Sequence, residues 1–321
     1  MTTVLLTRSE VEPLLHLPAL LSEMRQAFQA YSLERPIPAQ RVRSPLPGQD
    51  AKGAMLLFPG LLPGIPAYTV KVHAKFPSQQ PAIKGVLLLH DLETGNLLAI
   101  MDSTAITAVR TGLAGALAAD LLARPDAGRV ALIGAGVQGA WQLRCLTLVR
   151  SLTQVLVYDT APGKADAFVQ LMSEELPFPV RAASSLADAT ERAEIIVSAT
   201  WSREPFLFPN MVQPGTHITT LGPDEPGKCE VAADLIQHGL FVCDDRDQAI
   251  RMGALGSVGL DGRAVHAELG EVIAGVKSGR MSAEQITIYG GVGLAFQDLT
   301  TCWYVYQQAG HPESRSLDFL S

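Results

Sequence analysis

The second half of the chain alternates short apolar runs with amphipathic stretches. Six runs after residue 128 have the length and apolar character of buried strands. They are Val130–Ile133, Gln154–Tyr158, Ile195–Ala199, His217–Leu221, Phe241–Cys243 and Gln285–Tyr289. Stretches of helical periodicity lie between them, including Gly163–Glu175, Ser185–Ala193 and Ala267–Lys277. Because a parallel neighbour is reached only by carrying the chain across a face of the sheet, this alternation predicts parallel strands linked by helices.

Residues 1–115 follow a different pattern. A helix is expected near Val11–Tyr31, followed by a Pro-rich segment and strand-like runs at Tyr68–His73 and Gly85–His90. The turn Asp91–Gly95 then leads into Leu97–Met101, as in a β-hairpin. The pattern therefore predicts an α+β domain rich in antiparallel strands.

The length and hydrophobic content fit two domains. The chain has 321 residues, of which 47% are hydrophobic. We expect the antiparallel-rich domain over residues 1–117 and a doubly wound α/β domain with a parallel sheet over residues 118–293. The helix Thr104–Ala123 would connect them, and a last helix, Leu294–Gln308, would pack back on the first domain with the remainder of 294–321.

Charge and cysteine usage exclude several classes of partner. The net charge is −7 and the 25 Lys and Arg residues are spread along the chain, so a nucleic acid partner is not expected. Arg8, Glu10 and Glu12 occupy the place of a secretory apolar run, and no membrane span is expected. The four cysteines form no Cys-x-x-Cys pair, which favours reduced thiols in a cytoplasm and no metal site.

A glycine-rich turn follows the first apolar run of the second domain. Gly134, Gly136 and Gly139 form a G-x-G-x-x-G pattern between the strand and the helical run Ala140–Val149. The first glycine permits a tight turn, the second lets backbone N–H groups approach a pyrophosphate, and the third lets helix and strand pack closely. The pattern favours a Rossmann-type dinucleotide site, although glycine-rich turns also occur without a ligand.

An aspartate ends the next predicted strand. Asp159 lies 20 residues past Gly139, where an acidic side chain accepts both ribose hydroxyls and repels a 2′-phosphate. This placement favours NAD over NADP. The alternative is a cap for the segment that begins near Pro162.

The first domain offers cations for an acidic substrate. Arg110 lies on an otherwise apolar helix of small residues, where a buried guanidinium needs an anionic partner. An internal salt bridge is the alternative. Period two places Lys71 and Lys75 on one strand face, either solvated or lining a site, and Lys84 and Arg41 are weaker candidates.

A loop after the predicted strand His217–Leu221 carries an aspartate. Asp224 lies in Gly222-Pro-Asp-Glu-Pro-Gly-Lys228, and ligands of doubly wound sheets lie beyond the carboxyl ends of the strands. Asp224 is therefore a candidate for the nicotinamide end of the site. A plain turn aspartate is the alternative.

Several ordered blocks of the sequence resemble the ornithine cyclodeaminase/mu-crystallin family over nearly the whole chain. They are Asp91-x-x-Thr-Gly95 with Leu98–Asp102, Thr107-x-x-Arg110-Thr111, Gly134-x-Gly-x-Gln138, Pro214–Ile218, Gly222-x-Asp-x-Pro-Gly-Lys228, Gly270–Gly275 and Gly291–Asp298. The resemblance implies a substrate-binding and dimerising first domain, a Rossmann domain and a homodimer. Residues 193–200 and 270–279 resemble the archaeal alanine dehydrogenase branch of the family at least as closely as they resemble the cyclodeaminases.

The resemblance also implies roles for individual residues. Arg110, Lys71 and Arg41 would hold the α-carboxylate of an amino acid, and Asp224 would act near its nitrogen as general base, so Lys71, Arg110 and Asp224 are the catalytic candidates. The residues implied in NAD binding are Gly134, Gly136, Gln138, Gly139, Asp159, Ser198, Ala199, Thr200 and Thr111. Family patterns differ at Thr219-Thr220, Gly253-Ala254 and Gly291, and we have no physical account of what Ala254 alters.

The chemistry implied by the resemblance begins with hydride transfer from Cα to the nicotinamide, which leaves an imine. Attack by the δ-amine of ornithine would give proline and ammonia, and this cyclodeamination is the first expectation. Attack by water would give a 2-oxo acid, as in an alanine dehydrogenase, and an imine reductase runs the redox step in reverse. A nicotinamide-dependent binder of a small ligand, like mu-crystallin, is the alternative of another class.

Overall fold

The protein divides into two compact units. The computed structural model describes residues 2–34, 37–46, 53–76, 79, 81–310 and 316–317, so part of the Pro-rich segment and most of the predicted C-terminal tail lie outside the described residues. Unit 1 comprises Met1–Arg110 with Leu294–Ser321, and unit 2 comprises Thr111–Gly293. The division falls after Arg110, within a helix, whereas the sequence placed the boundary after residue 117.

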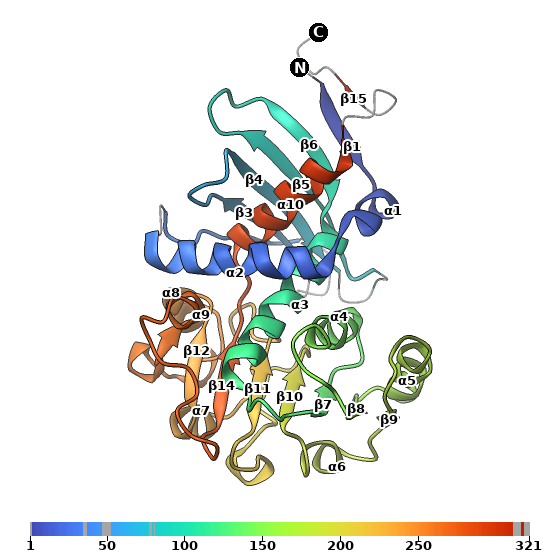
Figure 1. The fold of residues 1–321 in the computed structure, drawn as a ribbon, viewed down its shortest axis with the longest axis vertical. Coiled ribbons are helices and arrows are strands. Elements are labelled where there is room, and N and C mark those ends of the chain that lie inside the picture. Colours follow the sequence, from blue (N-terminus) through green and yellow to red (C-terminus); the bar gives the residue numbers. More distant parts are fainter. Residues whose placement is uncertain are drawn as a thin grey trace. The chain divides into compact units, whose positions relative to one another are not determined.

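Unit 1 contains a mixed sheet (Figure 1). Its strand order is β15-β1-β6-β5-β4-β3-β2, and neighbours are antiparallel except β1 and β6, which are parallel. The bounds are β1 Thr3–Leu6, β2 Val42–Pro45, β3 Ala54–Gly60, β4 Ala67–Lys75, β5 Ile83–Asp91, β6 Leu97–Asp102 and β15 Ser316–Leu317. The three predicted strands are β4, β5 and β6. The sequence did not predict β3, whose Pro59 and Gly60 are unusual in a strand.

Two long helices of unit 1 pack on each other, and the second of them also packs on the sheet. The predicted first helix is broken into α1 Arg8–Val11, the 3-10 helix η1 Glu12–Leu14 and α2 Leu17–Glu34, because Pro13 and Pro18 are tolerated only in a first turn. The last helix, α10 Ala295–Ala309, contacts α2, β3 and β4. Its Phe296 ring stacks on Tyr31 with the centroids 4.5 Å apart. This packing brings α10 beside β4, although 227 residues separate Lys71 from Asp298.

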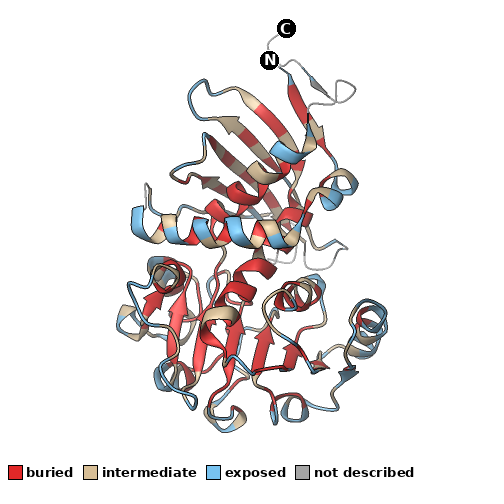
Figure 2. Cartoon of the chain, viewed as in Figure 1, coloured by how far each residue is buried: buried red, intermediate tan, exposed pale blue. Residues whose placement is uncertain are grey.

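Unit 2 contains a wholly parallel sheet, as predicted. The strand order is β13-β12-β14-β11-β10-β7-β8-β9, so β7 lies where the order of strands reverses. The bounds are β7 Arg129–Ile133, β8 Gln154–Tyr158, β9 Val180–Ala182, β10 Ile195–Ser198, β11 His217–Thr220, β12 Leu240–Cys243, β13 Ala267–Glu268 and β14 Thr287–Gly290. The strands are mostly buried (Figure 2), as expected when helices cover both faces of a sheet.

The helices of unit 2 connect consecutive strands. They are α4 Val137–Leu146, α5 Lys164–Glu175, α6 Leu186–Thr190, α7 Ala233–His238, α8 Arg246–Arg251 and α9 Leu269–Ile273, with the 3-10 helices η2 Pro209–Met211, η3 Gly256–Val258 and η4 Gly262–Ala264. The predicted helix Ala267–Lys277 is shorter, because its first two residues pair with β12 as β13. Helix α3 Ser103–Leu122 is apolar enough to cross a membrane, yet 78% of its most apolar window is buried inside the protein.

Candidate functional site

The glycine loop of unit 2 has the geometry that a diphosphate needs. Gly134 has φ of +103°, and a Cβ there would lie 2.6 Å from the carbonyl oxygen of Ala199. A Cβ on Gly139 would lie 2.6 Å from the carbonyl oxygen of Gly134. A Cβ on Gly136 would meet no atom within 4 Å, so this side of the loop is open. Two glycines therefore serve packing, and the middle one leaves room for a ligand.

The start of α4 also fits an anion. Gly136 is the N-cap of α4 and has no side-chain capping bond, so the first N–H groups of the helix remain available. Gln138, in the first turn, has a buried Oε1 that accepts no hydrogen bond from the residues described. The sequence predicts that Gly134, Gly136, Gln138 and Gly139 hold the diphosphate of a dinucleotide, and the open side of the loop at Gly136 is compatible with that prediction.

Asp159 joins the glycine loop to the end of β8. Its Oδ2 accepts a hydrogen bond from the backbone N–H of Ala135 at 2.9 Å, and its Oδ1 accepts one from that of Ala161 at 2.9 Å. The bond from Ala161 is a local turn bond. Asp159 is not the helix cap considered as the alternative, because the N-cap of α5 is Gly163. The bond from Ala135 places the carboxylate beside the loop, where an acidic side chain accepts ribose hydroxyls in dinucleotide-binding domains.

The predicted stretch Ser198–Thr200 is held by a carboxylate that the sequence did not indicate. Glu230 is fully buried, and it accepts hydrogen bonds from the Ser198 hydroxyl at 2.7 Å and from the Thr200 N–H at 2.7 Å. It also accepts one from the Thr220 hydroxyl at 2.6 Å. The Ser198 side chain is therefore turned into the protein, at the carboxyl end of β10.

Asp224 lies on the loop after β11 and has a cationic partner. Lys228 Nζ is 2.8 Å from Asp224 Oδ1 and 3.8 Å from Glu225 Oε1. The same ammonium lies over the ring of Trp201, 4.0 Å from its centroid. Because Lys228 is 5% exposed and Asp224 is 30% exposed at the side chain, the lysine is fixed while the carboxylate is partly open. The catalytic role of Asp224 and the alternative of a turn residue both remain compatible with this local ion pair.

Unit 1 gathers two of the predicted cations around one carboxylate. Lys71 Nζ lies 2.9 Å from Asp298 Oδ1, and Arg110 Nε lies 3.2 Å from the same oxygen. Arg110 Nη1 also donates to Gln297 Oε1 at 2.9 Å. All these side chains are at least 91% buried. Strand β4, helix α3 and helix α10 thus converge on a cluster with two cations and one anion.

Burial controls the protonation of this cluster. Desolvation lowers the pKa of Lys71 to about 7, because the Asp298 carboxylate only partly offsets it and Arg110 lowers it further. His73, on the same face of β4, accepts or donates a hydrogen bond at 2.6 Å with the Ser103 hydroxyl. Burial and the charges of Lys71, Arg110 and Lys75 lower the pKa of His73, so its ring is neutral. Lys71 is therefore a group that exchanges a proton near neutral pH.

The remaining candidates separate into neighbours of the cluster and surface residues. The Arg41 guanidinium lies 4.5 Å from the centroid of the Phe58 ring, and Lys71 Nζ lies 5.5 Å from the same centroid. Both cations thus contact the same ring, and the charge of Arg41 lowers the pKa of Lys71. Lys84 bonds the side chain of Gln79 on the surface, outside the cluster. Thr111, on α3, accepts a hydrogen bond from Gln142 at its backbone oxygen and belongs to unit 2.

Sequence reasoning assigned no role to Asp298, although the residue closes one of the family blocks. The signal was the cation on an apolar helix: Arg110 required an anion, and Asp298 supplies it. The internal salt bridge considered as an alternative for Arg110 is therefore present. It does not exclude a ligand, because one carboxylate balances only one of the two cations.

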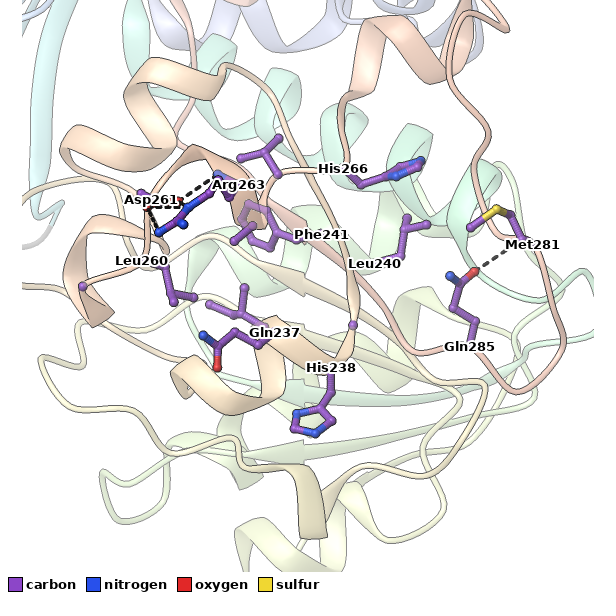
Figure 3. Close-up of a pocket in the computed structure, with 15 residues that line it drawn as sticks. Gln237, His238, Leu240, Phe241, Leu260, Asp261, Arg263, His266, Met281 and Gln285 are labelled. Atoms are coloured by element: carbon purple, nitrogen blue, oxygen red, sulfur yellow. Dashed lines mark hydrogen bonds and ion pairs between the residues drawn. The ribbon is translucent and has the colours of Figure 1, made fainter.

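A separate cavity lies at the amino ends of strands of the unit 2 sheet, away from the glycine loop at the carboxyl end of β7 (Figure 3). Its volume is about 970 Å³, and residues at the amino ends of β12 and β14, such as Leu240 and Gln285, line it together with His238 and His266. None of the predicted site residues is among those that line it. Ligands of doubly wound sheets bind beyond the carboxyl ends, so this cavity is not the dinucleotide site.

The strand order of unit 2 and its glycine loop define a dinucleotide-binding protein of the Rossmann class. Unit 1 adds a buried cluster of two cations, Lys71 and Arg110, around one carboxylate, Asp298. The chain belongs to the ornithine cyclodeaminase/mu-crystallin family, whose model matches residues 1–313. The family expected from the sequence is thereby confirmed, and its members include dehydrogenases and reductases.

Three relatives show how far the similarity extends. Alanine dehydrogenase of Archaeoglobus fulgidus is 34% identical over 317 residues, which cover 96% of each chain. The solved structure of an archaeal alanine dehydrogenase dimer with bound NAD has a TM-score of 0.90, 32% identity and full coverage of both chains. Thermococcus litoralis Δ1-pyrroline-2-carboxylate reductase, solved with NADH and L-proline, has a TM-score of 0.91, 31% identity and coverage of 98% and 100%. The predicted fold class is confirmed.

Proposed function

We propose that this protein is an NAD-dependent oxidoreductase that interconverts a small α-amino acid and the corresponding α-imino acid. The observation that carries the proposal is the buried cluster of Lys71 and Arg110 around Asp298, which has one cation more than it neutralises. A carboxylate is the anion that an arginine beside a lysine binds in a defined orientation. The open glycine loop supports NAD as the cofactor.

Each proposed role follows from the environment of the residue. Arg110, with two of its nitrogens held by Asp298 and Gln297, presents a fixed guanidinium to the substrate carboxylate. Lys71 has a pKa near neutrality and accepts the proton that the substrate nitrogen loses on oxidation. Arg41 supplements the cation cluster, and Asp224 serves as general base once the imine has formed. Bound NAD would accept the hydride that leaves Cα, and NADH would donate it in the reverse direction.

The reaction balances without further components. Loss of hydride and a proton from the amino acid gives the imino acid and NADH, and water then releases ammonia to leave a 2-oxo acid. Reduction of a cyclic or open imine is the same redox step in reverse. The alanine dehydrogenase and the pyrroline-2-carboxylate reductase among the relatives carry names for these two directions.

Ornithine cyclodeamination, the first expectation from the sequence, has less support. The δ-ammonium of ornithine needs an anionic partner, and Asp298 is the one carboxylate that contacts Lys71 or Arg110 among the described residues. Its contacting oxygen is already shared by two cations. A neutral or anionic side chain fits these charges better than a cationic one, so cyclodeamination stays a prediction.

We further propose a homodimer formed through the exposed face of the unit 1 sheet. The face opposite α10 carries apolar side chains of adjacent strands, with Val42 54%, Met55 37% and Val86 38% exposed. Val72 pairs with Val86, so the exposed side chains continue from strand to strand. A second copy is the partner we favour, because the archaeal alanine dehydrogenase structure that covers the whole chain is a dimer.

The experiment measures ammonia and NADH together. The purified protein is incubated with NAD and a panel of neutral, acidic and basic amino acids, and in reverse with NADH, 2-oxo acids and ammonium or a cyclic imine. We expect equal yields of ammonia and NADH with a neutral or acidic substrate. Arg110→Ala should lower kcat/KM about 100-fold or more and leave the Kd for NAD within about twofold, whereas Arg263→Ala, at a 92% exposed side chain, should change neither.

Other outcomes identify the alternatives. Ammonia without NADH from ornithine would establish cyclodeamination and overturn the dehydrogenase assignment. No turnover in either direction, with NAD bound normally, would indicate a binding protein. Full activity of Arg110→Ala would remove the carboxylate clamp on which the proposal rests.

A further inference from the structure

We propose that Glu230 is a positioning residue that fixes the strand ends of β10 and β11 and, with them, the loop that carries Asp224. The inference rests on the proposed function, because Asp224 is the base assigned there. Glu230 is fully buried in unit 2, between the loop after β11 and the start of α7. Sequence reasoning assigned it no role.

Five hydrogen bonds converge on the Glu230 carboxylate. Its Oε1 accepts from the N–H of Thr200 at 2.7 Å and from the Thr200 hydroxyl at 2.8 Å. Its Oε2 accepts from the Ser198 hydroxyl at 2.7 Å, the Thr220 hydroxyl at 2.6 Å and the Gly222 N–H at 3.0 Å. One side chain therefore joins the ends of two neighbouring parallel strands.

The donors around Glu230 require an acceptor atom at both ends of its side chain. Each oxygen faces a backbone N–H, of Thr200 on one side and of Gly222 on the other, and a backbone N–H only donates. The NH2 group of an amide in this place would set a hydrogen against one of these two N–H groups. Hydrogen bonds of this number and kind stabilise a buried carboxylate that has neutral partners.

The same side chain closes the loop from Gly222 to Glu230. The N–H of the first residue bonds the side chain of the last, and the backbone oxygen of Glu230 accepts from the N–H groups of Phe206 and Leu207 at 3.0 Å each. A Cβ on Gly222 would lie 2.3 Å from Glu230 Oε1, so the chain passes in direct contact with the carboxylate. Asp224 and Lys228 lie inside this closed loop, and its closure sets their position.

The test compares Glu230→Gln with a matched control, Thr220→Val. The glutamine keeps the shape but opposes an N–H with its amide whichever way it is turned, whereas the valine removes one hydroxyl and leaves both N–H contacts. Hydrogen exchange in the protein without cofactor is followed by mass spectrometry in peptides spanning 199–203 and 221–229. We expect Glu230→Gln to raise exchange there about tenfold, and Thr220→Val less than about threefold.

Kinetics supply the second measurement. Glu230→Gln should lower kcat about tenfold or more with KM for the amino acid changed less than about threefold, because the base is misplaced while the clamp of unit 1 is intact. If Glu230→Gln does not fold, Glu230→Asp takes its place, since it keeps the charge but is one methylene shorter. The substituted protein should show the same directions of change.

The outcomes separate the two proposals. Exchange and kcat of Glu230→Gln equal to those of Thr220→Val would overturn the role of Glu230. A wild-type protein that turns over no amino acid or imine would refute the proposed function, while the exchange measurement would still decide whether Glu230 holds the two strand ends.

Discussion

The single carboxylate of Asp298 contacts two cations, and this sharing determines what the site can bind. The contacts of Lys71 and Arg110 fall on the same oxygen, Oδ1, at 2.9 and 3.2 Å. Two buried cations with a single anion are stable only if a pKa shifts or a further anion binds. Lys71 shows the first response, since desolvation lowers its pKa to about 7. The substrate carboxylate supplies the second.

The pH profile of Asp298→Asn tests this arrangement. Lys71 must be neutral to accept a proton, so kcat/KM for oxidation of the amino acid should rise as pH increases through about 7. The Asp298 carboxylate favours the ammonium form, so its removal lowers the pKa of Lys71 and should move the rise to lower pH by about one unit. Asp261→Asn, at an exposed carboxylate, is the control. An unchanged midpoint in Asp298→Asn would contradict the coupling.

The role of a residue could be predicted from the sequence where a charged side chain lies in an otherwise apolar segment. Arg110 on an apolar helix demanded a partner, and period two placed Lys71 on the face of His73 and Lys75. Asp298 and Glu230 were not predicted as site residues. Each is distant in sequence from at least some of its partners, and only the packing of α10 on β4, or of β10 beside β11, creates the contact.

The glycine loop at the start of α4 joins two functions in one element. Gly134 and Gly139 serve close packing within the protein, whereas Gly136 faces open space. Its φ of −108° and ψ of −173° are accessible to any residue, so the backbone does not require glycine there. The loop therefore offers a substitution that separates folding from ligand binding.

Paired alanine substitutions make that separation measurable. Gly139→Ala places a Cβ 2.6 Å from the Gly134 oxygen and should lower the free energy of unfolding by about 1–3 kcal/mol. Gly136→Ala meets no protein atom and should leave stability within about 1 kcal/mol, yet weaken NAD binding about tenfold or more by occupying the approach to the loop. Thermal unfolding and calorimetric titration measure both. Unchanged NAD affinity in Gly136→Ala would contradict the assigned ligand path.

Elements could be predicted where their periodicity was strong. The six predicted strands of unit 2 correspond to β7, β8, β10, β11, β12 and β14, whereas β9 and β13, with three and two residues, are too short for a pattern to stand out. Gly275, with φ of +71°, lies within the predicted helix Ala267–Lys277, whose observed form α9 ends at Ile273. Local sequence thus indicated the sheet but not its edges.

The exposed apolar face of the unit 1 sheet is the surface through which we propose that two copies of the chain associate. Val86→Glu would place a charge in the centre of the proposed dimer interface, where burial without a partner is unfavourable. We expect light scattering to show mainly the mass of one chain, against two for the wild type. Leu171→Glu, at a 50% exposed side chain of α5, should remain dimeric. A dimeric Val86→Glu protein would exclude this face.

Because Lys71 and Arg110 share one oxygen of Asp298, binding of the substrate depends on pH. When a bound carboxylate joins Lys71 and Arg110, the ammonium form of the lysine gains a second counter-ion, and the complex retains hydrogen ions that the free protein releases near neutrality. Association then takes up a fraction of a proton, although neither the amino acid nor NAD titrates in that range. The Kd for the amino acid should therefore fall as the pH decreases through about 7.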